Sequence, residues 1–515
     1  MAQMRVFDGR AGRAGVGARS IAGAIGLLML AACTVGNDYQ RPAVDAPAQF
    51  RFGKPLPGAA DGVATMETGA AAREVNRGWW RQFGDPVLDD LIAQALSGNR
   101  NLRVALANVD QAAGVLAQTR SAFFPQLGYQ GQAARQRASR LGANPIPSGS
   151  PNTADALSAL LVASWEIDLW GRLRRASEAA QANLLAVQEV RRGIMVTLVA
   201  QVATAYIQLR GLDEQYDIAL RTRQTYAASL DLFKLQFRHG VVSRMAIAQA
   251  ESALETATAQ IPLIELQRAQ TENALSVLLG RNPGPIVRGR SILEMTLPVV
   301  PAGLPSDLLE QRPDLRASEQ QLVAANARVG VAKAAYYPDI SLTGAFGQSS
   351  AQLSDLFKGP ARTWSFGAGL TGPIFTAGAI AAQVAQAEAA QRAAIESYQI
   401  AIQNAFADVD DALVARAKLV EQNEAQARLV LSLSDYSRLA RLQYTGGYTP
   451  YFTVLQAEQQ LFPAQLSWAG TRAQLLASMA ALYQASGGAW VTAAESLVGS
   501  SAAPTGGSGT ASTQR

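Results

Sequence analysis

Two stretches of this chain, 207 positions apart, share one sequence framework. Residues 235–251 read LQFRHGVVSRMAIAQAE, and residues 442–458 read LQYTGGYTPYFTVLQAE. The same offset relates three pairs of glycines: Gly171 and Gly378, Gly240 and Gly447, Gly280 and Gly487. A self-similarity of this length indicates that one architectural unit is written twice, so the fold must accommodate two copies of it.

Each copy opens with a helical stretch, at about 86–121 and 305–335, which ends at an aromatic pair followed by proline. Proline stops a helix and pushes the preceding residue toward extended conformations. Alternating segments follow, such as TWSFGAGL at 363–370, in which large apolar residues and small residues take opposite faces. Such segments of about ten residues are typical of transmembrane β-strands, although any one of them alone could belong to a soluble sheet.

Two such segments in each copy give four strands per chain. Four strands cannot close a barrel, and an open sheet edge is not tolerated in hydrocarbon. The chain must therefore oligomerise. A dimer would supply eight strands and a trimer twelve, and the strand pattern by itself does not choose between them.

The rest of each copy is predicted to be helical. Residues 171–238 and 378–444 lack proline and are rich in Ala, Gln, Leu, Arg and Glu, which favour helix. About 67 residues at ~1.5 Å each make a rod on the order of 100 Å. These rods are expected to be too polar for a membrane and to project into water. Pro262 and Pro463 fall in the shorter helices that follow, where we expect local kinks.

The repeated stretch itself is predicted to be helix, tight reversal, helix. Gly240 and Gly447 fall where the long helices should end, and glycine accepts the left-handed conformation found there. Ser243 and Thr449 are suitable N-caps for the next helix, with Pro450 at its first position.

Reactive residues are scarce in this chain, which has one cysteine, Cys33, and one histidine, His239. An internal disulfide and a His/Cys zinc site are therefore excluded, and any catalytic triad would have to use His239. The second copy replaces His239 with Gly446. We expect His239 to be a surface residue at a helix end and the protein not to be an enzyme, with no catalytic residue, metal site or cofactor.

The amino-terminal segment has the features of a targeting signal. Residues 1–32 combine several arginines with the apolar run IAGAIGLLMLAA, which is shorter than the roughly 20 residues that span a bilayer. This segment carries +3 of the net charge of +5, so the remainder has 5 − 3 = +2, too little for a nucleic-acid interface. The sequence Leu30-Ala31-Ala32-Cys33 resembles the lipobox of bacterial lipoproteins. That resemblance implies covalent lipid on Cys33, and Thr34 after it implies sorting to the outer membrane. An ordinary signal peptide is the alternative.

Four further motifs carry a family resemblance: GNDYQRP at 36–42, WWRQFGDPVLDDLI at 79–92, SWEIDLWGRLRR at 164–175 and GPIFTAG at 372–378. By these motifs and their order, the chain is identified as a member of the outer-membrane factor family of TolC-like conduits. It is most similar to the lipoprotein branch that contains OprM and NodT-type proteins. The resemblance runs from about residue 21 to residue 490.

The resemblance implies a mainly α fold with a transmembrane β-barrel: a homotrimer with a twelve-stranded barrel and a periplasmic α-helical tunnel. The implied function is that of a passive outer-membrane channel in a tripartite, RND-type efflux system that exports drugs or other small molecules. The implied partners are a periplasmic adaptor (membrane fusion) protein, an inner-membrane transporter and outer-membrane lipid, with no nucleic acid. One alternative is the outlet of a type I protein secretion system. Another is a lipid-anchored trimeric spacer or adhesin without a pore, which would show sustained heptads instead of duplicated strand pairs.

The same resemblance implies that the hairpin tips are the narrow end of the tunnel and the seat of the adaptor. The residues it nominates are Arg238, Gly240, Val241, Ser243 and Arg244 in the first copy, and Gly446, Gly447, Tyr448, Pro450 and Tyr451 in the second. The alternative is that only the glycines matter, for turning. The chain also departs from its relatives, which commonly continue with Leu-Asp-Val after the tip. No Asp or Glu occurs between 436 and 457, so no cation-binding gate is nominated.

These patterns divide the chain into six segments: a signal peptide 1–32, a lipid-anchored segment 33–85, a first repeat 86–280, a linker 281–304, a second repeat 305–490 and a tail 491–515. Each repeat is expected to contain a helix, a strand pair and a long helical hairpin. The tail is small and polar, a composition typical of disorder.

Overall fold

The computed structural model describes residues 34–44, 47, 50–52, 78–139, 149, 151–298 and 310–487. The signal peptide, Cys33 and the tail lie outside the described residues. The chain forms two compact units, and both repeats contribute to each. Unit 1 contains residues 1–42, 110–186 and 319–397, and unit 2 contains residues 43–109, 187–318 and 398–515. The units differ from the repeats because the long helix of each repeat runs through both.

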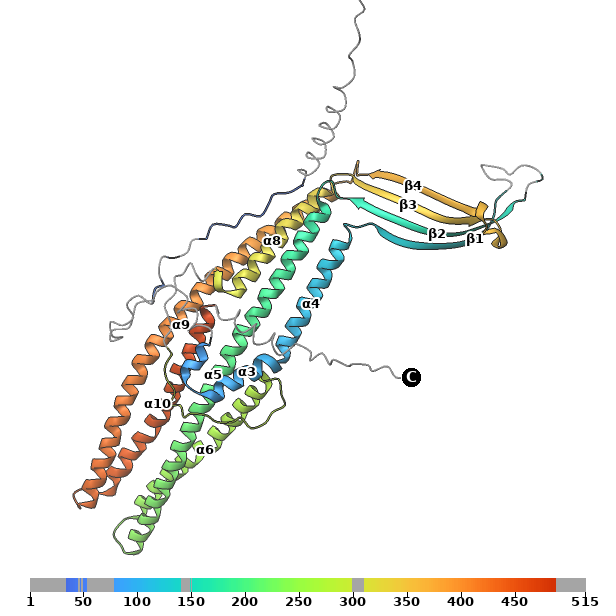
Figure 1. The fold of residues 1–515 in the computed structure, drawn as a ribbon. Coiled ribbons are helices and arrows are strands. Elements are labelled where there is room, and N and C mark those ends of the chain that lie inside the picture. Colours follow the sequence, from blue (N-terminus) through green and yellow to red (C-terminus); the bar gives the residue numbers. More distant parts are fainter. Residues whose placement is uncertain are drawn as a thin grey trace, which may run out of the picture. The chain divides into compact units, whose positions relative to one another are not determined.

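Unit 1 contains a four-stranded antiparallel sheet in the order β1-β2-β3-β4 (Figure 1). Its strands are β1 Gln126–Arg137, β2 Thr153–Ile167, β3 Asp339–Ser350 and β4 Arg362–Thr371. The first repeat supplies β1 and β2 and the second supplies β3 and β4. The predicted strand pairs are therefore confirmed, and the two pairs join through β2 and β3.

The two faces of this sheet differ in chemistry. One row crosses all four strands, because Tyr129 lies opposite Leu161, Leu161 opposite Phe346, and Phe346 opposite Trp364. These four side chains are 55–90% exposed. The neighbouring positions, on the other face, carry mostly Gln, Ser, Thr, Gly and Ala. A sheet with a row of exposed apolar side chains on one face and mainly small or polar side chains on the other is suited to lie between lipid and water.

The segment that follows Cys33, residues 34–41, is fastened to both repeats within unit 1. Arg175 at the start of the first long helix donates a 2.8 Å hydrogen bond to Asp38. Glu319 of the second repeat accepts a 2.8 Å hydrogen bond from Arg41. The segment thus has a fixed path along helices that belong to different copies.

The long helices have the predicted length. Helices α5 (Arg172–Arg238) and α9 (Ala379–Thr445) have 67 residues each. Their partners α6 (Arg244–Leu278) and α10 (Tyr451–Ala485) have 35 each. Pro262 and Pro463 lie inside these partner helices without interrupting them, and the local kink expected at each stays a prediction.

The helical stretch expected over residues 86–121 is present, with one break inside it. It forms α3 (Pro86–Gly98) and α4 (Arg100–Ser121), separated by the buried Asn99. The Asn99 side chain donates to the carbonyl of Leu278 at 2.8 Å and accepts from the amide of Leu102 at 3.0 Å. The break therefore forms where the end of α6 meets the start of α4.

The second repeat has the equivalent junction. Helix α8 (Pro313–Ala334) begins directly after Arg312, whose guanidinium donates to the carbonyl of Ala485 at 3.1 Å. The end of α10 thus meets the start of α8. Within the helical stretch expected over 305–335, the described residues 310–311 are helical, Arg312 is not, and α8 follows from Pro313, so this stretch is also broken once.

The glycines paired by the repeat share one backbone conformation. All six have positive φ: 81° and 85° at Gly171 and Gly378, 71° and 77° at Gly240 and Gly447, 76° and 90° at Gly280 and Gly487. The left-handed region is costly for any residue with a β-carbon, which explains why these positions persist while their neighbours diverge.

The main core of unit 2 forms between α5, α3, α10 and the short 3-10 helix η2 (Trp79–Phe83). Trp79 stacks on Tyr483 with ring centroids 4.7 Å apart. The buried residues of α5 between Met195 and Leu209 complete this core. Helix α5 is the one described helix that is long and apolar enough to cross a membrane by length and composition, and more than half of that stretch is buried. The expectation that both rods are too polar to span a membrane does not hold for the composition of α5, and core packing accounts for its apolar stretch.

Candidate functional site

The reversal between α5 and α6 is closed by two backbone hydrogen bonds. The amide of Gly240 donates to Phe237 O, and the amide of Val241 donates to Gln236 O, both at 2.9 Å. These are the two bonds of a Schellman motif, in which glycine takes the left-handed position. A β-carbon on Gly240 would meet no atom within 4 Å, so this glycine is required by its φ angle and not by crowding.

The reversal between α9 and α10 is built in the same way. The amide of Gly447 donates to Tyr444 O at 3.0 Å, and the amide of Tyr448 donates to Gln443 O at 2.9 Å. The motif constrains Gly447 but not the residue before it. This explains why His239 of the first copy can be Gly446 in the second.

The capping predicted at the second tip is wrong by one residue. Helix α10 begins at Tyr451, with Pro450 as its N-cap, so Thr449 does not cap it. Pro450 takes the place that Ser243 has at the first tip, and both are extended, with ψ of 155° and 161°. Neither cap makes a side-chain hydrogen bond. The fixed φ of proline suffices to set the entry into the helix.

Nine of the ten nominated tip residues are exposed: Arg238, Gly240, Val241, Ser243, Arg244, Gly446, Gly447, Tyr448 and Pro450. They lie on the two turns and their flanks. Tyr451 differs, because only 9% of its surface is exposed. Tyr451 is therefore placed to hold the hairpins together and not to contact a partner directly.

Tyr451 joins the two hairpins. Its ring packs edge-to-face on Phe233 of α5 at 4.7 Å and on Tyr444 of α9 at 4.9 Å. Its hydroxyl forms a hydrogen bond with Ser229 of α5. Nearby, Gln236 of α5 donates to the hydroxyl of Tyr444 at 2.7 Å. Near the turns the hairpins are thus joined by one aromatic wedge and two side-chain hydrogen bonds, next to the apolar core that α5, α6, α9 and α10 share.

A buried carboxylate lies two turns along α10. Glu458 pairs with Arg441 of α9 through Oε1, while its buried Oε2 has no partner among the described residues. Burial raises the pKa of Glu458 above its ordinary value, against the opposing effect of Arg441. The hydroxyl of Tyr226 is also buried without a partner in the described structure. The tip is therefore polar inside as well as at its surface.

Sequence reasoning missed the exposed apolar residues beside the turns. Phe237 and Met245 flank the first turn, and Leu442 and Phe452 flank the second, with exposures from 42% to 69%. An apolar side chain at an exposed turn is itself a signal for an interaction surface. Among the described residues, no cluster of His, Cys, Asp or Glu could hold a metal ion.

The fold and these hairpins define a class of protein. A duplicated chain that joins a sheet with one lipid-type face to helices of 67 residues is a subunit of a membrane channel with a long aqueous extension.

Comparison with known proteins agrees with this class. The family described as outer membrane efflux protein matches residues 91–281 and 304–488. The chain is 37% identical over 465 residues to the probable efflux pump outer membrane protein SepC of Pseudomonas putida, covering 90% of this chain and 95% of SepC. It is 34% identical over 465 residues to the cation efflux system protein CusC of Escherichia coli, covering 90% of this chain and 97% of CusC. The open state of the Neisseria gonorrhoeae MtrE outer membrane channel has the same fold, with a TM-score of 0.78, 31% identity and coverage of 89% and 99%.

The chain belongs to the outer membrane efflux protein family. The fold class and the family predicted from the sequence are confirmed, and the protein is an outer-membrane channel component of an efflux system. Pump components are accordingly its partners.

Proposed function

We propose that three copies of this chain form the passive exit duct of a tripartite, RND-type efflux system. The duct receives small molecules from an inner-membrane transporter through a periplasmic adaptor and releases them outside the cell. It is a conduit and not an enzyme, and acyl chains on Cys33 add a second attachment to the outer membrane.

The observation that carries this proposal is the sheet, with its apolar face and its two open edges. Strands β1 and β4 each pair on one side only in the described structure. A barrel wall leaves no edge open, so β4 of one copy would pair with β1 of the next. This contact is head-to-tail and closes into a ring under rotational symmetry. Three copies supply the twelve strands of the proposed barrel.

The hairpins provide the aqueous part of the path. Helices α5 and α9 are each on the order of 100 Å long at ~1.5 Å per residue, which is enough to extend far from the barrel. Their tips present two surfaces in each copy. The first tip carries Arg238 and Arg244, while the second has no charged residue between Arg441 and Glu458. We assign both tips as seats for the adaptor.

The relatives handle more than one class of cargo. One relative of Pseudomonas putida is a toluene efflux pump outer membrane protein, and CusC belongs to a cation efflux system. Ducts of one fold thus serve different cargo, and we propose that small organic solutes are the cargo here.

The test is the accumulation of a fluorescent dye and of several antibiotics in a deletion strain, with and without the wild-type gene. Restored export supports the proposal. A matched control restores the gene with Tyr129→Lys and Trp364→Lys, which place charge on the lipid face of the edge strands and should abolish export. Unchanged accumulation with the wild-type gene, despite a trimer in the outer membrane, would overturn the small-molecule assignment.

A further inference from the structure

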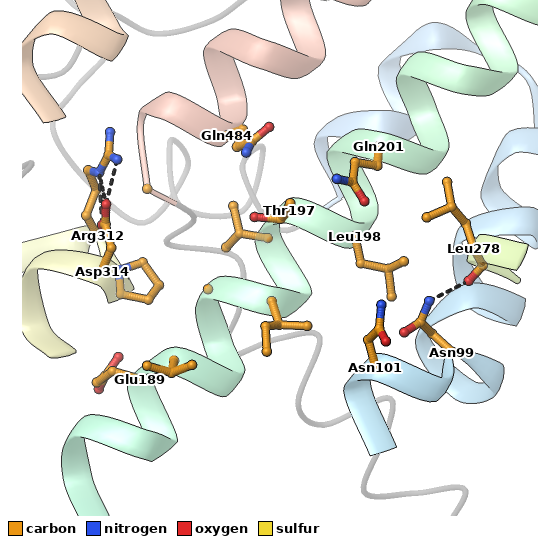
Figure 2. Close-up of a pocket in the computed structure, with 16 residues that line it drawn as sticks. Asn99, Asn101, Glu189, Thr197, Leu198, Gln201, Leu278, Arg312, Asp314 and Gln484 are labelled. Carbon is orange, nitrogen blue, oxygen red and sulfur yellow. Dashed lines mark hydrogen bonds and ion pairs between the residues drawn. The ribbon is translucent and has the colours of Figure 1, made fainter. Parts of the chain in front are cut away.

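Unit 2 contains a cavity of about 630 Å³ away from the tips (Figure 2). It lies beside α5, between the two helix junctions described above. Asn99, Asn101 and Leu278 line it from the α6–α4 junction. Arg312, Pro313, Asp314, Gln484 and Gly487 line it from the α10–α8 junction. The repeat thus places one helix junction on each side of α5.

Helix α5 presents two parallel stripes to this cavity. Each stripe runs along the helix at four-residue spacing, which keeps its members on one face. The polar stripe is Glu189, Gly193, Thr197 and Gln201. The aliphatic stripe is Val190, Ile194 and Leu198. The wall of the cavity is therefore amphipathic along its length.

The glycine in the polar stripe keeps the cavity open. A β-carbon on Gly193 would point toward Pro313 at 3.9 Å, so a larger side chain would fill the space between α5 and α8. Glycine within a helix costs about 1 kcal/mol relative to alanine. Local helix stability therefore does not favour Gly193, whereas an open cavity does.

The polar stripe of α5 faces away from the main core of unit 2, whereas Leu198 of the aliphatic stripe belongs to that core. Met195, Val199, Val202 and Tyr206 of α5 are buried in that core against α3 and η2. At about 100° per residue these positions lie on the side of α5 opposite to Gly193 and Thr197. The polar stripe is therefore the part of α5 that this core leaves for contact with a solute in the cavity.

The charges at the cavity leave one acceptor free. Glu189 is 9% exposed, and its buried Oε2 has no hydrogen-bond partner in the described structure. Its Oε1 accepts from Arg192 at 2.6 Å and lies 3.6 Å from Arg316. Arg312 is occupied by Asp314 at 2.6 Å and Asp408 at 2.9 Å. Both lining carboxylates are thus already paired, Glu189 with Arg192 and Asp314 with Arg312, and the acceptor left without a partner is Oε2 of Glu189.

We infer that this cavity is a transient binding site for amphipathic amines on their way through the duct. The ammonium group donates to the free Oε2 of Glu189, and the apolar body lies along Val190, Ile194 and Leu198. Carboxylate beside an aliphatic wall is the complement of such a solute, because one end gains a charge-assisted hydrogen bond and the other is removed from water. The inference rests on the proposed function, which supplies the solute and the tunnel.

The experiment uses a single introduced thiol. The variant Thr197→Cys places a cysteine in the polar stripe of a chain whose one native cysteine is Cys33. The full-length trimer, in amphipol, is treated with a maleimide in the presence of octylammonium or of octanol, which share a tail and differ in the polar end. Octylammonium should slow labelling at lower concentration than octanol does.

Two further variants separate the contributions. Glu189→Gln should raise the protecting concentration of octylammonium about tenfold, the effect of losing roughly 1.4 kcal/mol, and leave octanol unchanged. Ile194→Ala should weaken protection by both probes. Glu214→Gln, on α5 outside the cavity, is the matched control and should change neither. Trimer on a gel confirms that each variant is assembled.

The amine assignment would be overturned if octylammonium and octanol slowed maleimide labelling equally and Glu189→Gln changed neither effect. The site itself would be overturned if neither probe slowed labelling. Export in the deletion strain is measured in parallel on the same variants. If the cells export the dye but neither probe slows labelling, this site alone is refuted. If a probe slows labelling but the cells do not export the dye, the exit function is refuted instead.

Discussion

Close to the turns, the two hairpins meet at Tyr451, and its removal should loosen the contact between the tips. In Tyr451→Ala the packing on Phe233 and Tyr444 is lost, together with the hydrogen bond to Ser229. Truncating a buried aromatic residue to alanine typically costs ~3–5 kcal/mol, which includes the cavity left behind. A loss of roughly 3 kcal/mol per copy shifts a separation equilibrium about a hundredfold.

Tyr451→Phe isolates the hydroxyl. Ser229 also donates to the carbonyl of Thr225 at 2.9 Å, so this variant leaves no serine hydroxyl without a partner. The expected cost is therefore that of one net hydrogen bond, ~1 kcal/mol. Together, the two variants separate the free energy of the contact into a contribution from packing and a contribution from the hydrogen bond.

The measurement is amide hydrogen exchange in the first turns of α10, where Val454 and Leu455 are buried, and electrical conductance of the reconstituted trimer. Tyr451→Ala should speed exchange and raise conductance, with Tyr451→Phe between it and the wild type. Tyr448→Ala is the matched control, because Tyr448 is 84% exposed and lies at the same tip. Similar exchange in Tyr448→Ala and Tyr451→Ala, or no change in Tyr451→Ala, would refute the wedge.

Three other changes test the remaining structure. Gly447→Ala should destabilise the second hairpin by ~1–2 kcal/mol, because the φ of Gly447 is 77°. Gly446→Ala should not show this backbone penalty, and chemical denaturation of the two variants measures the difference. Burial raises the pKa of Glu458 above 4.5, so the folded tip holds this proton more tightly than the unfolded chain. Tip stability should therefore increase as pH falls from neutral toward 4.5, and hydrogen exchange of Glu458→Gln should lose that dependence. A β-carbon on Gly36 would lie 2.8 Å from the Cα of Gly330, so Gly36→Ala should release residues 34–41 from α8. Limited proteolysis should then cleave this segment in Gly36→Ala but not in the control Gln40→Ala.

The sequence was sufficient for features that depend on local geometry. Proline placement and helix-forming composition gave the two 67-residue helices, and period-two alternation gave the strand pairs. The breaks at Asn99 and Arg312 could not be found in this way. Each depends on a carbonyl more than 170 positions away along the chain, at Leu278 and Ala485. Local propensity contains no information about such a partner.

At the candidate site, too, some features could be predicted from the sequence and others could not. Repeat alignment alone located both turns and explained their glycines. It did not separate Tyr448 from Tyr451, since two tyrosines three positions apart look equivalent until the other hairpin is in place. The pairing of Arg441 with Glu458 was missed for the same reason, because α10 must turn back along α9 before the two residues meet.

Duplication followed by divergence explains why the two tips now differ. The reversal itself needs only one left-handed residue, and the structure keeps it at Gly240 and Gly447 with φ values 6° apart. Most of the other positions at the two turns differ between the copies. The first tip became basic, with Arg238 and Arg244, and the second became aromatic. A trimer would therefore present six turns with the same backbone conformation, of which three are basic and three are aromatic. An adaptor that binds all six turns must either recognise two different side-chain surfaces or contact only the backbone that the turns share. Replacing Arg238 and Arg244 by glutamine distinguishes these cases, because adaptor binding should become less sensitive to salt if the basic tips are read and stay unchanged if they are not.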